Sequence, residues 1–337
     1  MPARNAMRKV LIGLAVLLIV GTAAYLRYRH PSAPLGVGYA GNRIVTLWST
    51  SAQVREPVVT VNYGEKLDVL QRFQDQVQVR TANGTTGWIP ERDLLSADLW
   101  QTSKDLEKKA ATMPIEAHGH TKALSNLHIA PGRESLRVRQ LNKDIPLDVL
   151  ERQPVVAPAV HATGAGENSS APSEKKEDWW LVRAHAVDQT TMTGWIMGHF
   201  IDLDVPAPLP DYANSAGMRI VAWQELSRVA DASNNPKAQY LLVGTHGPEG
   251  QPCDFSLLRV YTWGQKKERY ETAFVESDVC GKLPIKVQKA ATPGGEARFE
   301  FENLTGKGPE RRAYVMRQTV VRRVREGAEP KPHKRKG

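Results

Sequence analysis

The sequence has little of the chemistry that enzymes usually display. Only two cysteines, Cys253 and Cys280, occur in 337 residues, and neither lies in a recognisable nucleophile context. Residues 244–247 (Gly-Thr-His-Gly) lack the lysine and the following helix that a phosphate-binding glycine-rich loop requires. These absences predict a protein that is not an enzyme and that uses no cofactor.

A metal-binding pattern is also missing. His118, His120 and His128 lie near one another in the sequence and could be considered as zinc ligands. No carboxylate-His-Asp grouping accompanies them, although catalytic and structural zinc sites need three or four ligands at defined spacing. We therefore expect ordinary exposed histidines and no bound metal.

The body of the chain lacks a positive charge excess, although the whole chain has a net charge of +9. Residues 1–30 carry five Lys/Arg and no Asp/Glu, and residues 305–337 carry a net charge of +8, so residues 31–304 carry −4. Nucleic-acid binding needs a basic face on the folded surface. The distribution argues against a nucleic-acid partner.

Long apolar runs are absent except for one near the N-terminus. Residues 10–26 form 17 residues without a charge, at the short end of the roughly 17–25 residues that span a bilayer and longer than a usual signal-peptide core of about 7–15 residues. No cysteine follows, which excludes an ordinary lipoprotein anchor. We expect a single-pass membrane anchor with the rest of the chain periplasmic or otherwise outside the cytoplasm. A cleaved signal remains the alternative.

The two cysteines suit such a location, because an oxidising compartment allows Cys253 and Cys280 to pair. Closing a loop of this size would stabilise the fold by about 3 kcal/mol on the chain-entropy estimate. Two buried free thiols are the alternative.

A short phrase occurs twice in the chain. Residues 64–70 (Gly-Glu-Lys-Leu-Asp-Val-Leu) are followed by 86–89 (Thr-Gly-Trp-Ile), and 144–150 (Asp-Ile-Pro-Leu-Asp-Val-Leu) by 193–196 (Thr-Gly-Trp-Ile). Self-similarity of this kind predicts that two segments build the same small module. The offset grows from 80 residues at Leu67 to 107 at Trp88. The larger offset means that the second copy contains an insertion. We place it in residues 153–177, which are rich in Ala, Pro, Gly and Ser, and we expect it to be disordered.

The second copy contains further motifs in a fixed order: 126–132 (Asn-Leu-His-Ile-Ala-Pro-Gly), 148–150 (Asp-Val-Leu), 179–182 (Trp-Trp-Leu-Val) and 194–196 (Gly-Trp-Ile). This order resembles the bacterial Src-homology-3-like (SH3b) domain family, which shows an Asn-x-Arg-x-x-Pro-type loop, a Val-x-Val-Leu strand, a Trp-x-x-Val strand and a Gly-Trp-Val/Ile close. His128 stands where the family usually has Arg. The resemblance implies small five- to six-stranded barrels that bind cell-wall peptides or other proteins.

The tryptophans of the motifs are the candidate contacts, because large flat rings can stack on a sugar or lie along a peptide. Strand alternation places neighbours on opposite faces, so one of Trp179 and Trp180 should be buried and the other exposed to ligand. A glycine allows a tight turn, and the tryptophan after it is expected to plug the barrel end. The candidate ligand-binding residues are Trp179, Trp180, Trp195, Trp88, Asn126 and His128.

The C-terminal region resembles no family. Short apolar segments separated by Gly and Pro predict seven strands and an antiparallel sandwich or open barrel, near 218–229, 238–246, 255–264, 269–276, 283–288, 297–303 and 312–325. The whole chain is then mainly β. Its expected parts are an N-terminal anchor (1–30), a tether (31–42), barrel 1 (43–96), a helical connector (97–118), barrel 2 (119–204), a Pro-rich linker (205–211), a C-terminal β domain (212–326) and a disordered basic tail (327–337).

The sequence predicts a non-enzymatic, membrane-tethered protein that binds peptidoglycan or an envelope protein through its barrels. A structural or adaptor subunit of an envelope complex is the alternative from another class. A divergent enzyme in the C-terminal domain is a minor one.

Overall fold

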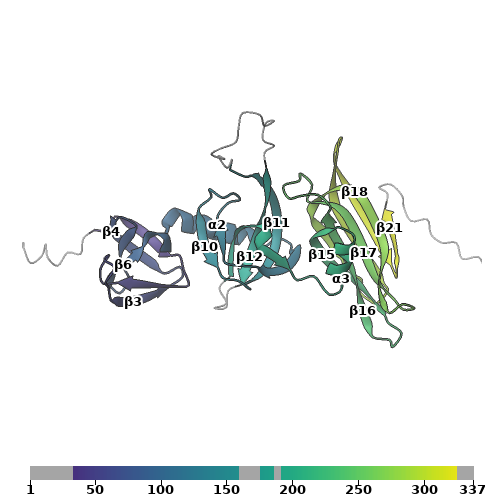
Figure 1. Ribbon diagram of the computed structural model, residues 1–337, viewed down its shortest axis with the longest axis horizontal. Helices are drawn as coiled ribbons and strands as arrows, with labels where there is room; N and C mark the ends of the chain where they lie inside the picture. The colour runs from purple at the N-terminus through teal and green to yellow at the C-terminus, as the bar shows by residue number, and fades with distance from the viewer. Residues whose placement is uncertain (1–32, 159–174, 186–190, 325–337) are drawn as a thin grey trace, which may run out of the picture. The chain divides into compact units, whose positions relative to one another are not determined.

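The computed structural model describes residues 33–158, 175–185 and 191–324. The expected anchor at 10–26, most of the insertion at 153–177 and the basic tail lie outside them. Within the described residues the chain is mainly β, with three seven-stranded antiparallel sheets and two α-helices (Figure 1). No helix among these residues has the length and apolar character to cross a membrane. The chain divides into two compact units, Met1–Trp100 and Gln101–Gly337.

The first unit contains one sheet, here called the first module. Its strand order is β3-β2-β6-β5-β4-β1-β7. Apolar residues alternate with polar ones along the strands, as a half-buried sheet requires, and nine of them form the core, from Ala40 to Ile89. The elements are β1 (Gly36–Ala40), β2 (Ile44–Trp48), β3 (Pro57–Asn62), β4 (Lys66–Phe73), β5 (Gln76–Arg80), β6 (Thr86–Pro90), the 3-10 helix η1 (Glu91–Asp93) and β7 (Leu94–Ser96).

Part of the expected tether belongs to this module. Residues 31–42 were expected to form a tether, but β1 lies within them and pairs with both β4 and β7. The glycine-containing composition of these residues did not indicate a strand, because backbone hydrogen bonds to two neighbouring strands hold β1 in place and side-chain packing is not required.

Helix α2 (Ala97–Ala110) follows the first module. The Ser96 hydroxyl accepts a hydrogen bond from the Leu99 amide at 3.2 Å, as a helix N-cap does. Trp100, the last residue of the first unit, stacks on Tyr39 with ring centroids 4.8 Å apart and meets Tyr63 edge-on at 5.4 Å. The expected helical connector is therefore present, but it ends before Pro114 and is shorter than 97–118.

The second unit begins with a sheet, here called the second module, whose order is β10-β9-β13-β12-β11-β8-β14. If each strand of the first module is matched to the strand seven places later, the two orders are identical. The elements are β8 (Ala117–Thr121), β9 (Ser125–His128), β10 (Arg137–Leu141), β11 (Pro146–Val156), β12 (Lys176–His185), β13 (Thr191–Met197), η2 (Gly198–Phe200) and β14 (Ile201–Leu203).

Register confirms the repeat at the level of single residues. Gln78 pairs with Trp88 in the first module, and Leu181 pairs with Trp195 in the second. A bulge interrupts β4 after Val69 and β11 after Val149, at corresponding positions. The phrase written twice in the sequence thus marks two copies of one strand arrangement.

The expectation of an entirely disordered insertion was wrong at its ends. Strands β11 and β12 extend into residues 153–177 and remain paired as far as Val156 and Lys176. Polar and Pro-rich composition excludes a core of its own, but it does not prevent two strands from continuing their hydrogen-bonded ladder.

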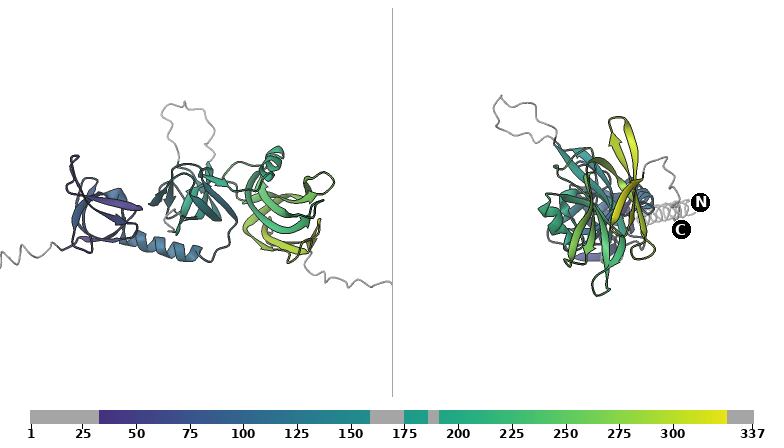
Figure 2. Two further views of the ribbon diagram at one scale, coloured as in Figure 1. Left: turned by 90° about the horizontal axis from the view of Figure 1, so that it is seen from below. Right: turned by 90° about the vertical axis from the view of Figure 1, so that its right-hand side faces the viewer.

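The C-terminal sheet is a meander in which every strand pairs with its sequence neighbours, in the order β15 to β21. It is one strongly curved sheet, with helix α3 (Leu209–Ser215) packed against one face (Figure 2). A core that includes Phe255, Phe299 and Tyr314 covers the other face. The strands are β15 (Arg219–Ala230), β16 (Pro236–Thr245), β17 (Phe255–Gly264), β18 (Arg269–Gln288), β19 (Glu296–Thr305), β20 (Gly308–Arg317) and β21 (Val320–Val324).

The expected boundaries need three corrections here. Residues 269–276 and 283–288 belong to one strand, β18, and 312–325 spans parts of two, β20 and β21. Helix α3 begins inside the Pro-rich segment 205–211, because proline at the first helical turn has no amide hydrogen bond to lose. Of the two expected alternatives, the single curved layer fits an open barrel and not a sandwich.

Candidate functional site

The six candidate ligand-binding residues lie in several places. Trp88 belongs to the first module, and the other five belong to the second. They divide further between a face covered by helix α2, a small pocket beside that face, and a cleft toward the C-terminal sheet.

One face of the second module is covered by the C-terminal half of helix α2. Leu106 and Ala110 of the helix pack on Trp179, Leu181 and Trp195. Trp179 is only 1% exposed and Trp195 only 6%. This face is therefore occupied by the chain itself.

The expectation that one of Trp179 and Trp180 would be exposed was wrong, since Trp180 is also only 6% exposed. The two rings lie on opposite faces of β12. Helix α2 covers the face of Trp179, whereas Trp180 lies beside the fully buried Ile196 of the neighbouring strand and lines a cleft toward the C-terminal sheet. Alternation gives the direction of a side chain, and burial depends on what packs against it.

The glycine of the Gly-Trp phrase has a different role from the one expected. Gly87 and Gly194 lie within strands β6 and β13 and make no tight turn. A Cβ atom on Gly87 would lie 2.7 Å from Leu47 Cβ, and one on Gly194 would lie 2.5 Å from Leu127 Cγ. The glycine lets a buried leucine of the neighbouring strand approach the backbone, and the tryptophan that follows points to the opposite face.

Three candidates, Asn126, His128 and Trp179, line a small pocket of about 130 Å³ at the edge of the covered face. The His128 ring meets Trp179 edge-on with centroids 5.1 Å apart. His128 Nδ1 lies 2.8 Å from the Ser135 carbonyl oxygen, which can only accept, so Nδ1 carries a proton. Asn126 is exposed, and its side-chain oxygen accepts from the Gln140 amide at 3.3 Å. The pocket has room for one small side chain.

The equivalent face of the first module carries a pair of half-buried tryptophans, Trp48 and Trp88. They pair across β2 and β6 as His128 and Trp195 do across β9 and β13. The Arg55 guanidinium lies 4.6 Å from the centre of the Trp48 ring, within cation–π range. Trp48 and Arg55 were missed from the sequence. The constant offset of 80 residues from Trp48 to His128 could have identified the tryptophan.

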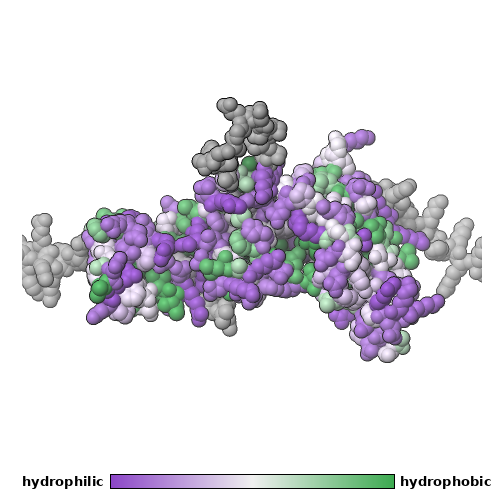
Figure 3. All heavy atoms as spheres, in the orientation of Figure 1, coloured by the Kyte–Doolittle hydropathy of each residue, from purple (hydrophilic) through white to green (hydrophobic). Residues whose placement is uncertain are grey.

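We call these two equivalent surfaces the shared face. In the second module, Trp179 and Leu181 occupy the positions that Gln76 and Gln78 hold in the first. On the side of the molecule drawn in Figure 3, apolar residues form small groups among hydrophilic ones. The shared face consists of Trp48, Gln76, Gln78 and Trp88 in the first module and of His128, Trp179, Leu181 and Trp195 in the second.

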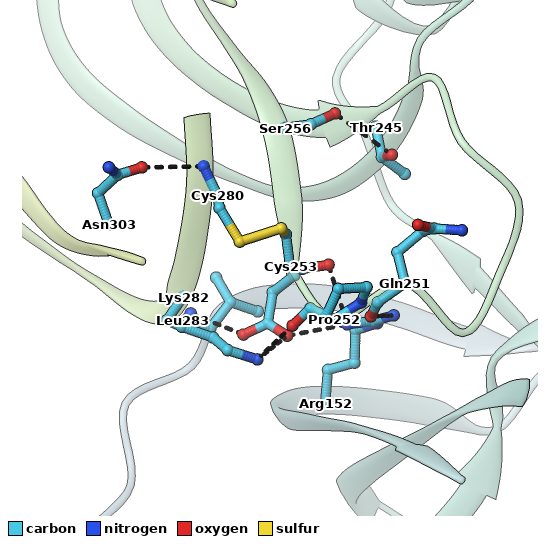
Figure 4. Close-up of a disulfide and its surroundings, with 11 residues drawn as sticks. Arg152, Thr245, Gln251, Pro252, Cys253, Ser256, Cys280, Lys282, Leu283 and Asn303 are labelled. Carbon is cyan, nitrogen blue, oxygen red and sulfur yellow. Dashed lines mark hydrogen bonds and ion pairs between the residues drawn. A yellow bond between two sulfur atoms is a disulfide. The ribbon is translucent and has the colours of Figure 1, made fainter. Parts of the chain in front are cut away.

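A buried ion-pair network joins the second module to the C-terminal sheet (Figure 4). The Arg152 side chain is 2% exposed; its Nη2 lies 2.5 Å from Asp178 Oδ1 and its Nη1 lies 2.9 Å from Asp254 Oδ1. It also donates to the carbonyl oxygens of Gln251 and Cys253. Cys253 forms the expected disulfide with Cys280, which fixes the loop that supplies these acceptors to strand β18.

Two features bring that loop close to the second module. The Gly250 amide donates to Asp178 Oδ1 at 2.8 Å. A Cβ atom on Gly250 would lie 2.3 Å from Lys176 Cβ, and its φ of +80° favours glycine.

Glu116 lies at the same junction and is only 1% exposed. Burial raises the pKa of its carboxyl to about 7, the hydrogen bond from the Ile285 amide lowers it in part, and the charge of Asp254 raises it further. The Ile285 amide donates to Glu116 Oε2 at 3.1 Å.

A pocket on the C-terminal sheet measures about 510 Å³. It is lined by Lys282, Lys286, Glu300, Glu302 and Arg311 among others. The hydrogen bond from Arg311 holds the pKa of Glu300 below its usual value, so this carboxylate is ionised and paired. A general acid or base at neutral pH needs the opposite shift.

Two of the three histidines considered as zinc ligands, His118 and His120, lie within hydrogen-bond distance of carboxylates. His118 Nδ1 lies 3.0 Å from Asp148 Oδ1, and His120 Nδ1 lies 2.9 Å from Asp204 Oδ1. In the described part of the chain no group of three or more His, Cys, Asp or Glu is placed to hold a metal ion.

No protein-family model matches the sequence, and no curated protein matches it. The solved structures that are similar to the chain at low TM-score include the following three. One is an NlpC/P60 family protein from Bacillus cereus ATCC 10987, with 10% identity, 72% of this chain and 94% of that chain covered, and a TM-score of 0.22. The others are NlpC2 and NlpC1 from Trichomonas vaginalis, with 10% and 9% identity, 86% of this chain and 99% and 94% of those chains covered, and a TM-score of 0.18 each. At such scores the likeness does not establish a shared fold.

Proposed function

We propose that the chain is a non-enzymatic binding protein of the cell envelope. Residues 10–26 anchor it in the membrane, the remainder lies outside the cytoplasm, and the two modules are SH3-like barrels that recognise cell-wall peptides or a protein partner. The order of the motifs at 126–132, 148–150, 179–182 and 194–196 supports the family assignment. The identical strand order of the two modules extends it to the first.

One observation carries the binding role. The shared face of the second module packs against an amphipathic segment of the same chain, while that of the first module leaves Trp48 and Trp88 only partly buried. The packing of helix α2 on the second module is therefore an example of a segment that the shared face can bind. In the first module the two indole rings and the Arg55 guanidinium give a ligand both stacking surface and a positive charge.

The test is a sedimentation assay of the full chain, in detergent, with isolated bacterial peptidoglycan at low and moderate salt. We expect pelleting that survives moderate salt and that falls at least tenfold in a Trp48→Ala/Trp88→Ala double variant. Leu35→Ala is the matched control, because Leu35 is an exposed apolar residue of the same unit that lies outside the shared face. Pelleting that disappears with salt would assign binding to the basic tail by charge alone. Equal pelleting of the double variant would place the site elsewhere.

A structural or adaptor subunit of an envelope complex is the second candidate. It is favoured by the covered face of the second module and by the buried Arg152 network, which commit this module to contacts within its own chain. Stable co-purification with partner proteins, without affinity for wall material, would support this candidate over the first.

A further inference from the structure

A cleft of about 520 Å³ lies between the second module and the C-terminal sheet, within the second unit. Its volume falls in the range of roughly 300–1,000 Å³ that is typical of ligand sites, which often lie between domains. Trp180 lines the cleft together with Val149, and helix α3 contributes Pro210 and Asn214. The shared face lies on the other side of β12, so this cleft is a separate site.

Two strand edges line the cleft. Strand β14 is the last strand of the second module's sheet, and β15 is the first of the C-terminal sheet. Residues 201–203 of β14 and 219–221 of β15 both contribute to the lining. Edge strands present backbone donors and acceptors that have no partner within their own sheet.

The backbone bonds of β14 show which groups are available. The Lys122 amide donates to the Phe200 carbonyl and the Asp204 amide donates to the His118 carbonyl, so Ile201 and Leu203 direct their amide and carbonyl groups to the other edge. The Ile201 amide is used by the Gly198 carbonyl, and the Leu203 carbonyl by the Val205 amide. Among the residues that the structure describes, this leaves the Ile201 carbonyl and the Leu203 amide, as one acceptor and one donor along the cleft.

The facing edge of β15 differs between its beginning and its second half. Its second half is capped, since the Ala290 amide donates to the Leu226 carbonyl and the Gly294 amide to the Arg228 carbonyl. Within the described residues no such backbone hydrogen bond is found on this edge at residues 219–221, which line the cleft.

The charges of the cleft balance. Lys122 and Arg219 contribute two positive charges, and Asp202 and Glu249 two negative ones. A polymer of one sign gains little from such a lining. A neutral or mixed-charge chain with its own backbone donors and acceptors fits it better.

We propose that this cleft binds a short extended peptide, which adds as a strand beside β14 and β15 and places an apolar side chain against Trp180. Strand addition to an exposed sheet edge is a general mode of peptide recognition: main-chain hydrogen bonds supply affinity and pockets for alternate side chains supply specificity. The site does not depend on the shared face, so each can fail without the other.

The test uses the full chain in detergent and a fluorescein-labelled heptapeptide, Lys-Val-Thr-Val-Thr-Val-Glu, with fluorescence anisotropy as the readout. We expect saturable binding, and at least tenfold weaker binding of a peptide whose central Val is replaced by Pro, which removes a backbone donor. An Asn214→Trp variant should also bind at least tenfold more weakly, because Asn214 is exposed at the rim and an indole there would fill the cleft.

Ser215→Trp is the matched control, since Ser215 is the next exposed residue of α3 and does not line the cleft. Amide hydrogen exchange gives a second readout that needs no variant: bound peptide should slow exchange in residues 201–205 and 219–223. The proposal is overturned if the wild type shows no binding, if Asn214→Trp binds as Ser215→Trp does, or if exchange slows only in the first module.

Discussion

The two modules have the same strand order, the same bulge and the same register, yet residues at equivalent positions have opposite surroundings. Leu35 and Glu116 both donate their amide to the valine that precedes the bulge, at 2.7 and 2.8 Å. Leu35 is an apolar residue that is 68% exposed, whereas Glu116 is a carboxylate that is 1% exposed. Trp88 is only partly buried where Trp195 is buried.

The difference shows that the fold and the surface of this repeat are specified by separate residues. The core valines and leucines and the glycine before the tryptophan are common to both copies. The residues outside the core differ between the copies. In the second copy Trp179 and Leu181 pack against helix α2, and Arg152 forms an ion pair with Asp254. Substitutions at matched positions should therefore have unequal effects in the two modules.

The largest difference is expected for the paired arginines. Arg72 and Arg152 stand at the same position after the bulge, opposite Val77 and Trp180. Arg152→Ala should lower the free energy of unfolding of the second unit by about 3–5 kcal/mol, because the buried Asp178 and Asp254 would lose the guanidinium that bridges them. Only the more exposed Arg219, 3.6 Å from Asp178, and Lys282, 3.2 Å from Asp254, would remain beside them. Arg72→Ala should change stability by less than about 1 kcal/mol, since its pair with Glu91 is roughly half-exposed. Urea unfolding of the two variants measures both, and equal effects would refute the buried network.

The paired tryptophans should differ nearly as much. Trp195→Ala removes a 6% exposed ring packed near helix α2 and should cost about 3–5 kcal/mol. Trp88→Ala removes a ring that is less completely buried and lies outside the core of its module, and it should cost about 1–2 kcal/mol. Thermal unfolding followed by circular dichroism would show this, and a larger loss for Trp88→Ala would contradict the account of the covered face.

Sequence reasoning recovered the parts of this comparison that depend on local pattern. The repeated phrase, the mainly β composition and the cysteine pair were sufficient to predict two like modules, a third β region and the disulfide. The exposure of Trp179 and Trp180 could not be predicted from the sequence. It depends on helix α2, which packs over Trp179, and on the residues that line the cleft beside Trp180. Strand β1 and helix α3 were missed because their segments are rich in Gly or Pro. Strand β1 is ordered by pairing with two neighbouring strands, and helix α3 tolerates proline in its first turn.

The pH dependence should distinguish the second unit from the first. Glu116 has a pKa raised to about 7 from the ordinary 4.5, so the folded second unit holds a proton that the unfolded chain releases. Its stability should fall as pH rises from about 4.5 to 7, by an amount on the order of 3 kcal/mol, and level off above pH 7. Glu116→Gln should remove this contribution, as urea unfolding at pH 5 and pH 8 would show. An unchanged slope in the variant would assign the dependence to another group.

Reduction of the disulfide should give a somewhat smaller effect confined to the second unit. A Cys253→Ser/Cys280→Ser variant should lose about 2–4 kcal/mol, since the bridge closes a 27-residue separation and fixes the loop that binds Arg152. Calorimetry of the full chain would resolve the two units. A lower unfolding temperature of the first unit would contradict the expectation that only the second unit is affected.

The most direct test of the account is oxidative footprinting of the tryptophans in the full chain, with and without sonicated peptidoglycan. The account predicts that Trp48 and Trp88 are modified in the free protein and protected by the ligand, while Trp179 and Trp195 are spared in both states. Rapid modification of Trp195, or Trp48 and Trp88 equally reactive with and without peptidoglycan, would contradict it.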